Sequence, residues 1–211
     1  MQSKKALLLG CGSKWGSSFS KTVAESDYSV DLITSNNLNY PNINSIKINW
    51  NNFDLNSLKK HIDLKEYDLI FFNQNSGGSV GEHYLKTDNT ISLDHWNLSY
   101  WIDCQLPYYI IKHLSPLIKN STKIGWMLTG LITGRDENFF QYAGYACSKS
   151  TNLHIMRGFS RFHHGVFFAI NPFWFPPEDY EKDSKKILEI IENITEEDSG
   201  KTFDKNGKEW I

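Results

Sequence analysis

The chain has 211 residues, of which 40% are hydrophobic and 14% aromatic, so it can bury a substantial core and is not a disordered segment. Its net charge is −2, from 22 basic and 24 acidic residues, which argues against a nucleic-acid partner. The three cysteines, Cys11, Cys104 and Cys147, have no paired metal-ligand spacing, which predicts a reducing, cytoplasmic location. The first apolar run ends at a glycine and is too short for a leader or a membrane span, so no membrane partner is expected.

Six short apolar runs are predicted as strands, and most are continuously apolar, which is typical of strands buried on both faces. They cover Lys5–Gly10, Ser29–Thr34, Asn44–Asn49, Tyr67–Asn73, Lys123–Thr129 and Gly165–Asn171. Helices are predicted over Ser17–Glu25, Leu55–Ile62, Ser92–Ile118, Tyr142–Phe162 and Glu181–Ile194. The alternation predicts an α/β fold of the Rossmann type, with a doubly wound parallel sheet, helices on both faces and a single domain over residues 1–211.

The loop after the first predicted strand is rich in glycine, with Gly10, Gly12 and Gly16 between the strand and the helix. Such a loop lets backbone N–H groups approach a pyrophosphate at the helix N-terminus, where a Cβ would block the approach. Ser17 and Ser18 are expected to cap this helix or to donate to the phosphate. A plain glycine-rich turn is the alternative, but its place in an alternating chain favours nucleotide binding.

The second predicted strand ends in small polar residues, Thr34, Ser35 and Asn36, and no carboxylate stands there. In NAD sites of this type an acidic residue binds the ribose 2′-hydroxyl, whereas Asp31 lies too early, inside the strand. The polar residues leave room for a 2′-phosphate, which Lys14 in the glycine loop would neutralise. The sequence therefore favours NADP over NAD, and the alternative is that Lys14 is a solvated loop lysine.

Tyr145 and Lys149 are four residues apart on a predicted helix, so their side chains share one face. An ammonium beside a phenol favours the phenolate and so lowers the phenol pKa from its ordinary value of about 10. The pair is therefore a candidate proton-transfer device. The alternative is a packing tyrosine next to a solvated lysine, because this spacing also occurs by chance.

In their order and spacing these pieces resemble the short-chain dehydrogenase/reductase family, in its compact, carbonyl-reductase-like form, over nearly the whole chain. The family's Thr-Gly-x-x-x-Gly-x-Gly is similar to residues 11–18, where Ser18 replaces the last glycine. Its Asn-Asn-Ala-Gly is similar to residues 72–75, where only Asn73 matches. The C-terminal "EEDSGKTFDKNGKEW" resembles the family segment that introduces a final strand.

The resemblance implies a catalytic set in which Tyr145 is the acid/base and Lys149 is its activator and ribose ligand. Thr129, at the end of the fifth predicted strand, stands where the family has its active-site serine, and would donate to the substrate oxygen. The register of the long helix puts Asp103 where the family has a catalytic asparagine. A carboxylate there would hold a water near Lys149.

The residues expected to bind the cofactor mostly follow the strand ends: Gly10, Gly12, Ser13, Lys14, Trp15, Gly16, Ser18, Ser35, Asn73, Gln74, Asn75, Tyr145, Lys149, Pro172 and Phe173. The last two begin an aromatic segment that is expected to form an apolar lid or, alternatively, to anchor the last helix. No metal is expected, because the pair His163-His164 has no third ligand at metal spacing.

The resemblance thus implies an NAD(P)-dependent oxidoreductase that transfers a hydride between its nicotinamide cofactor and a small carbonyl or alcohol, as a homodimer or homotetramer. Thr129, Asp103 and Ser18 replace the family's active-site serine, its catalytic asparagine and its last loop glycine. These replacements leave open the alternative that the chain is a catalytically impaired NAD(P)-binding sensor or scaffold. An enzyme of sugar-nucleotide modification is a third idea, which is weaker because such chains usually carry a C-terminal substrate domain.

Overall fold

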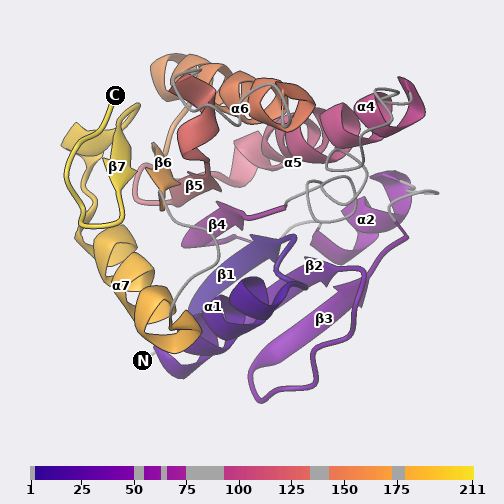
Figure 1. Cartoon of the computed structure of the whole chain (residues 1–211). Helices are drawn as coiled ribbons and strands as arrows, with labels where there is room; N and C mark the ends of the chain where they lie inside the picture. Colours follow the sequence, from indigo (N-terminus) through magenta and orange to yellow (C-terminus); the bar gives the residue numbers. More distant parts are fainter. Residues whose placement is uncertain (1–2, 50–54, 63–65, 75–92, 134–142, 173–178) are drawn as a thin grey trace.

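The computed structural model describes residues 3–49, 55–62, 66–74, 93–133, 143–172 and 179–211. Its centre is a seven-stranded sheet in the order β3-β2-β1-β4-β5-β6-β7, in which all neighbouring strands are parallel (Figure 1). The strands are β1 (Lys4–Leu9), β2 (Tyr28–Thr34), β3 (Ile43–Lys47), β4 (Leu69–Phe72), β5 (Lys123–Met127), β6 (Val166–Asn171) and β7 (Thr202–Asp204). The predicted α/β architecture is confirmed, including the final strand that the resemblance implied.

Helices cover both faces of the sheet (Figure 1). Successive residues of β1 divide between two cores, since Ala6 and Leu8 lie in one and Leu7 and Leu9 in the other. The first core is covered by α1 (Lys14–Glu25) and α7 (Tyr180–Asn193), and the second by α2 (Leu55–Ile62), α5 (Leu106–Leu114) and α6 (Ala143–Phe162). Continuous apolar runs are therefore needed in the central strands β1, β4, β5 and β6, because these strands bury both of their faces, whereas the edge strand β3 buries only Ile46.

The first helix begins earlier than predicted, at Lys14, because Ser13 caps it. The Ser13 hydroxyl oxygen accepts a hydrogen bond of 3.1 Å from the Gly16 N–H. The prediction that Ser17 or Ser18 caps this helix is wrong. Ser18 donates its hydroxyl to the Tyr180 carbonyl at 3.1 Å and so ties α1 to α7.

The long helix predicted over residues 92–118 is interrupted by a turn of π-helix. α4 (Leu93–Tyr100) leads into the π-helical turn η2 (Trp101–Gln105), which continues as α5 and ends in a short 3-10 turn. A π-turn inserts an extra residue into the helix, and such turns are frequent at functional sites. Asp103 lies at the centre of this turn and is buried.

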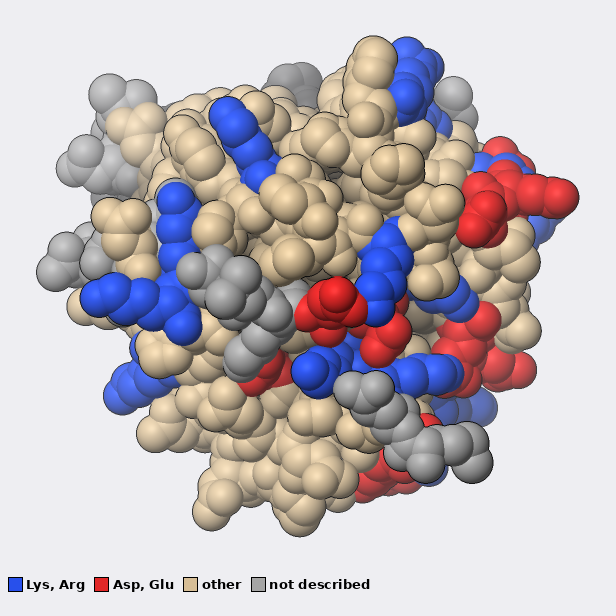
Figure 2. Space-filling model, turned by 180° about the vertical axis from the view of Figure 1, so that it is seen from behind, with Lys and Arg blue, Asp and Glu red and all other residues tan. Residues whose placement is uncertain are grey.

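In Figure 2, basic and acidic side chains lie next to one another at the centre and right of the face shown, whereas most of the rest of this face is uncharged. Among the described helices, none combines the length and the apolar composition that crossing a membrane requires.

Gly125 in β5 marks a place where the sheet has no room for a side chain. An added Cβ would lie 2.4 Å from the ring of Phe168 and 2.7 Å from the ring of Phe71. We expect Gly125→Ala to lower the free energy of unfolding by about 1–3 kcal/mol, because both rings must move. Urea unfolding followed by circular dichroism measures the change.

The matched control is Gly158→Ala on α6, where an added Cβ meets nothing within 4 Å. Alanine favours the helix over glycine by about 1 kcal/mol, so this variant should be neutral or more stable. If both variants lose the same stability, the loss in Gly125→Ala is not caused by the lack of space for a side chain in the sheet.

Candidate functional site

The order of the strands reverses at β1 and β4, and the loops that leave these two strands lie side by side. Ligands of open α/β sheets bind at such a switch point, outside the carboxyl ends of the strands. Gly10 follows β1 and donates its N–H to the Ile33 carbonyl at 3.0 Å. Asn73 follows β4 and donates its N–H to the Leu9 carbonyl at 2.9 Å. The backbone of both loops is therefore fixed to the sheet at this edge.

The glycine loop packs against the protein itself. Gly10 has a φ of +71°, and an added Cβ would lie 2.1 Å from the Cα of Gln74. At Gly16 an added Cβ would lie 2.5 Å from the Cα of Cys11. The sequence reasoning explained these glycines by the approach of a phosphate. The structure gives a second reason, since Gln74 in the loop after β4 and Cys11 in the loop after β1 leave no space for a side chain at these two positions.

The N-terminus of α1 points its first N–H groups at this edge, and they have no acceptor within the helix. The Ser13 hydroxyl accepts a hydrogen bond from the Gly16 N–H, and the Lys14 side chain next to Ser13 is exposed. Trp15 stacks on Phe19 with ring centroids 5.1 Å apart, and its buried Nε1 has no hydrogen-bond partner within the described part of the chain. The loop can therefore receive an anion at its backbone, while Trp15 belongs mainly to the core.

Gly12, in the loop after β1, lies beside polar groups at the end of β2. An added Cβ on Gly12 would lie 2.5 Å from Thr34 Oγ1, which accepts the N–H of Asn36 at 3.2 Å. Ser35 next to them is exposed. Asp31 lies within β2, as predicted, where its carboxylate accepts the Tyr67 hydroxyl at 2.9 Å. The residues that directly follow β2, 35–42, include no carboxylate.

Tyr145 and Lys149 share one face of α6, as their spacing predicted. The Lys149 ammonium lies 5.6 Å from the centre of the Tyr145 ring. Its Nζ donates to the Gln74 carbonyl at 2.5 Å and lies 3.9 Å from Asp103 Oδ1. Lys149 is only 1% exposed, so these groups replace water around the ammonium. The structure thus brings Tyr145, Lys149, Asp103 and Gln74 together from α6, η2 and the loop after β4.

Two further residues complete this cluster, and the sequence reasoning gave them no role. The Ser148 hydroxyl lies 3.0 Å from Asp103 Oδ2 and 2.8 Å from the Tyr145 carbonyl, and can donate to either. The Cys104 thiol donates to the Ser148 carbonyl at 3.0 Å. The one signal in the sequence was the position of Ser148 beside Lys149.

Burial controls the proton affinities in the cluster. It lowers the pKa of Lys149 below the ordinary 10.5, while the negative charge of Asp103 acts in the opposite direction. The pKa of the Tyr145 phenol is raised well above 10, first by burial and then by Asp103. The expectation of a pKa below 10 for this phenol is therefore wrong for this structure. The carboxylate and the loss of water together oppose the phenolate.

The remaining predicted residues lie at the same edge of the sheet or outside the described part. Thr129 is half-buried two residues after the end of β5, and the turn that follows it, η4 (Gly130–Thr133), packs against α6. Pro172 directly follows β6. Asn75 and Phe173, with the rest of the predicted lid, lie outside the described residues. The roles of all of these stay predictions.

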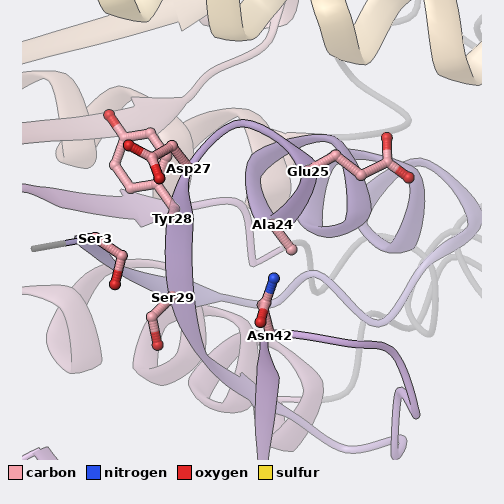
Figure 3. Close-up of a pocket in the computed structure, with 7 residues that line it drawn as sticks. All are labelled: Ser3, Ala24, Glu25, Asp27, Tyr28, Ser29 and Asn42. Carbon is pink, nitrogen blue, oxygen red and sulfur yellow. The ribbon is translucent and has the colours of Figure 1, made fainter. Parts of the chain in front are cut away.

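A hollow of about 380 Å³ lies at the opposite edge of the sheet (Figure 3). It is formed at the amino ends of β1 and β2 by Ser3, Ala24, Glu25, Asp27, Tyr28, Ser29 and Asn42. Since dinucleotides bind at the carboxyl ends of parallel strands, this hollow is not the place for a cofactor.

No protein-family model and no curated protein matches the chain. Solved structures do match it along nearly its whole length. A carbonyl reductase from Pseudomonas aeruginosa PAO1 in complex with NADP is 11% identical, with a TM-score of 0.78 and a match over 99% of both chains. A short-chain dehydrogenase/reductase, glucose/ribitol dehydrogenase, from Brucella melitensis is 15% identical, with a TM-score of 0.76 over 99% of this chain and 97% of that one. A short chain dehydrogenase from Salmonella enterica serovar Typhi is 13% identical, with a TM-score of 0.69 over 97% and 96%.

Proposed function

We propose that this chain, which has the fold of the short-chain dehydrogenase/reductases, belongs to that family. In this proposal it is an NAD(P)-dependent oxidoreductase that interconverts a small carbonyl compound and an alcohol. The observation that carries the proposal is the convergence of Tyr145, Lys149 and Asp103 beside the glycine loop at the switch point. Carbonyl reduction needs a dinucleotide and a proton donor side by side, and this edge of the sheet offers the groups for both. The NADP complex of the structurally similar carbonyl reductase supports the same choice.

The residues at this edge suit a dinucleotide. The backbone N–H groups at the start of α1 would donate hydrogen bonds to its pyrophosphate. The Lys149 ammonium suits a ribose hydroxyl, which would take the place beside Nζ that the Gln74 carbonyl now fills. The Gln74 side-chain amide is buried and has no partner within the described residues, so a polar group of the ligand would satisfy it. When bound, the nicotinamide supplies or accepts the hydride.

The phenol of Tyr145 serves as the acid in carbonyl reduction. Because burial and Asp103 raise its pKa, it holds its proton at neutral pH until a substrate oxygen gains negative charge. Lys149 binds the ribose and stabilises the phenolate that remains. Thr129 donates a hydrogen bond to the substrate oxygen. The same groups run the oxidation of an alcohol in reverse, with the phenolate as the base.

We further infer a cytoplasmic protein, because all three cysteines are free and Cys147 is exposed. The polar end of β2 and Lys14 favour NADP as the cofactor.

Replacing the proposed acid should separate binding from chemistry. We expect Tyr145→Phe to lower kcat for aldehyde or ketone reduction by about 10²–10⁴-fold, because phenylalanine has no hydroxyl proton to deliver to the substrate oxygen. NADPH binding, measured by the fluorescence of the nicotinamide, should be retained. The matched control is Tyr100→Phe at the end of α4, where the side chain is 36% exposed, and its activity should equal that of the wild type.

A second function is favoured by the acidic Asp103 and by the raised pKa of Tyr145, both of which oppose the phenolate. In this alternative the chain is a catalytically impaired NAD(P)-binding sensor or scaffold. NADPH binding without turnover of any aldehyde or ketone, and unchanged in Tyr145→Phe, would support it against the oxidoreductase.

The cofactor preference can be tested at the end of β2. We expect Ser35→Asp to weaken NADPH binding by about tenfold or more, because a carboxylate would repel the 2′-phosphate. NADH binding should not weaken. Ser35→Asn is the uncharged control. If Ser35→Asp and Ser35→Asn give the same ratio of NADPH to NADH affinity, the 2′-phosphate does not lie beside Ser35.

We propose that the chain forms a homodimer or homotetramer through α5 and α6. Large side chains are exposed there, with Tyr108 at 40%, Tyr109 at 41% and Phe162 at 83%. Light scattering after size exclusion should give two or four times the chain mass of 24.4 kDa, and Tyr109→Glu should lower it. A mass of one chain at all concentrations would contradict the proposal.

A further inference from the structure

Gln74 carries a buried polar side chain that the described part of the chain leaves unpaired. The residue is 2% exposed, and neither Nε2 nor Oε1 of its amide has a hydrogen-bond partner among the described residues. A buried polar group without a partner costs free energy, so native proteins pair almost all such groups with protein, water or ligand. Since no described residue supplies the partner, the amide is suited to a group from outside the chain.

Gln74 lies between the glycine loop and Lys149. A Cβ added to Gly10 would lie 2.1 Å from the Cα and 2.5 Å from the Cβ of Gln74, so this side chain starts directly beside the loop after β1. The carbonyl of the same residue accepts a hydrogen bond of 2.5 Å from Lys149 Nζ. In the proposed function the pyrophosphate lies at the start of α1 and the nicotinamide beside Tyr145. The nicotinamide ribose joins these two groups, so Gln74 lies where that ribose would pass.

The chemistry of the amide narrows the choice of the ligand group. Nε2 donates two hydrogen bonds and Oε1 accepts. A phosphate only accepts, so it would leave Oε1 unpaired. A ribose hydroxyl both donates and accepts, and the two neighbouring hydroxyls of a ribose can pair with Nε2 and Oε1 together. The nicotinamide carboxamide also donates and accepts, but it lies beyond the ribose and therefore farther from the glycine loop.

We propose that the side-chain amide of Gln74 binds the hydroxyls of the nicotinamide ribose, and so determines how tightly the site holds the nicotinamide half of the cofactor. The inference rests on the proposed function and deepens it. Gln74 stands where the similar family pattern, Asn-Asn-Ala-Gly, has an alanine, whose methyl group forms no hydrogen bond. The side-chain contact is therefore one that the family pattern does not supply.

The test compares the whole dinucleotide with its adenine half, which lacks the nicotinamide ribose. Calorimetry measures the affinities for NADPH and 2′,5′-ADP, or for NADH and ADP if the wild type prefers NADH. Gln74→Met keeps the length of the side chain without its polar atoms, and Gln74→Ala introduces the residue of the family pattern. Circular dichroism checks the folding of each variant, and where one does not fold, the other decides. The matched control is Gln105→Met, at the exposed end of η2.

We expect the affinity for NADPH to fall about tenfold in both Gln74 variants, because the hydrogen bonds to the ribose are lost. The affinity for 2′,5′-ADP should stay that of the wild type, and Gln105→Met should change neither affinity. The 3-acetylpyridine analogue of NADPH keeps the ribose but has no carboxamide, so its affinity should fall by the same factor. A smaller fall with this analogue would assign the amide to the carboxamide and overturn the inference.

Two further results would overturn the inference while the proposed function stands. An unchanged NADPH affinity in the Gln74 variants would mean that water alone pairs with the amide. Equal falls for NADPH and 2′,5′-ADP would mean that the amide does not act on the nicotinamide half. A wild type that binds no dinucleotide would instead overturn the proposed function, and the inference with it.

Discussion

The burial of the Lys149 ammonium is the constraint on which the rest of the site depends. A charge without water is stable only where protein acceptors replace its solvent. The Gln74 carbonyl and the Asp103 carboxylate do so, and they come from the loop after β4 and from the π-helical turn. Three parts of the chain, far apart in sequence, must therefore meet around one atom.

The glycine loop contributes to this arrangement in an indirect way. Gly10 lets the backbone of Gln74 approach so closely that any side chain at Gly10 would collide with it. The same backbone carries the carbonyl that accepts the Lys149 ammonium. The loop that would receive a phosphate and the lysine that would bind a ribose are thus linked through one residue. A change at Gly10 would disturb both.

The fold could be predicted from the sequence because most of its strands are continuous apolar runs, and α2 was found with its exact bounds. The final strand β7 has three residues, too few for a pattern, and came only from the resemblance. The interruption of the long helix could not be foreseen, because a π-turn leaves no mark in the apolar periodicity. The cap at Ser13 was missed because the helix begins inside the glycine loop rather than after it.

For the site, the spacing of Tyr145 and Lys149 was sufficient to place both side chains on one face of a helix. The register of the long helix against the family was sufficient to place Asp103 near them. Ser148 lay beyond this reasoning because its role depends on the turn that it contacts. The role of Gln74 as an acceptor for Lys149 belongs to its backbone, which no side-chain motif reveals. The pKa of Tyr145 was predicted in the wrong direction because a spacing shows which charge is near but not how much water is lost.

The most direct measurement of the central claim is a crystal structure of the chain in complex with NADP. The account predicts the pyrophosphate at the N–H groups that open α1, a ribose hydroxyl bonded to Lys149 Nζ, and the Tyr145 hydroxyl facing the nicotinamide ring. A dinucleotide bound elsewhere, or one bound at the glycine loop while Lys149 remains bonded only to Gln74 and Tyr145 faces away, would contradict the account.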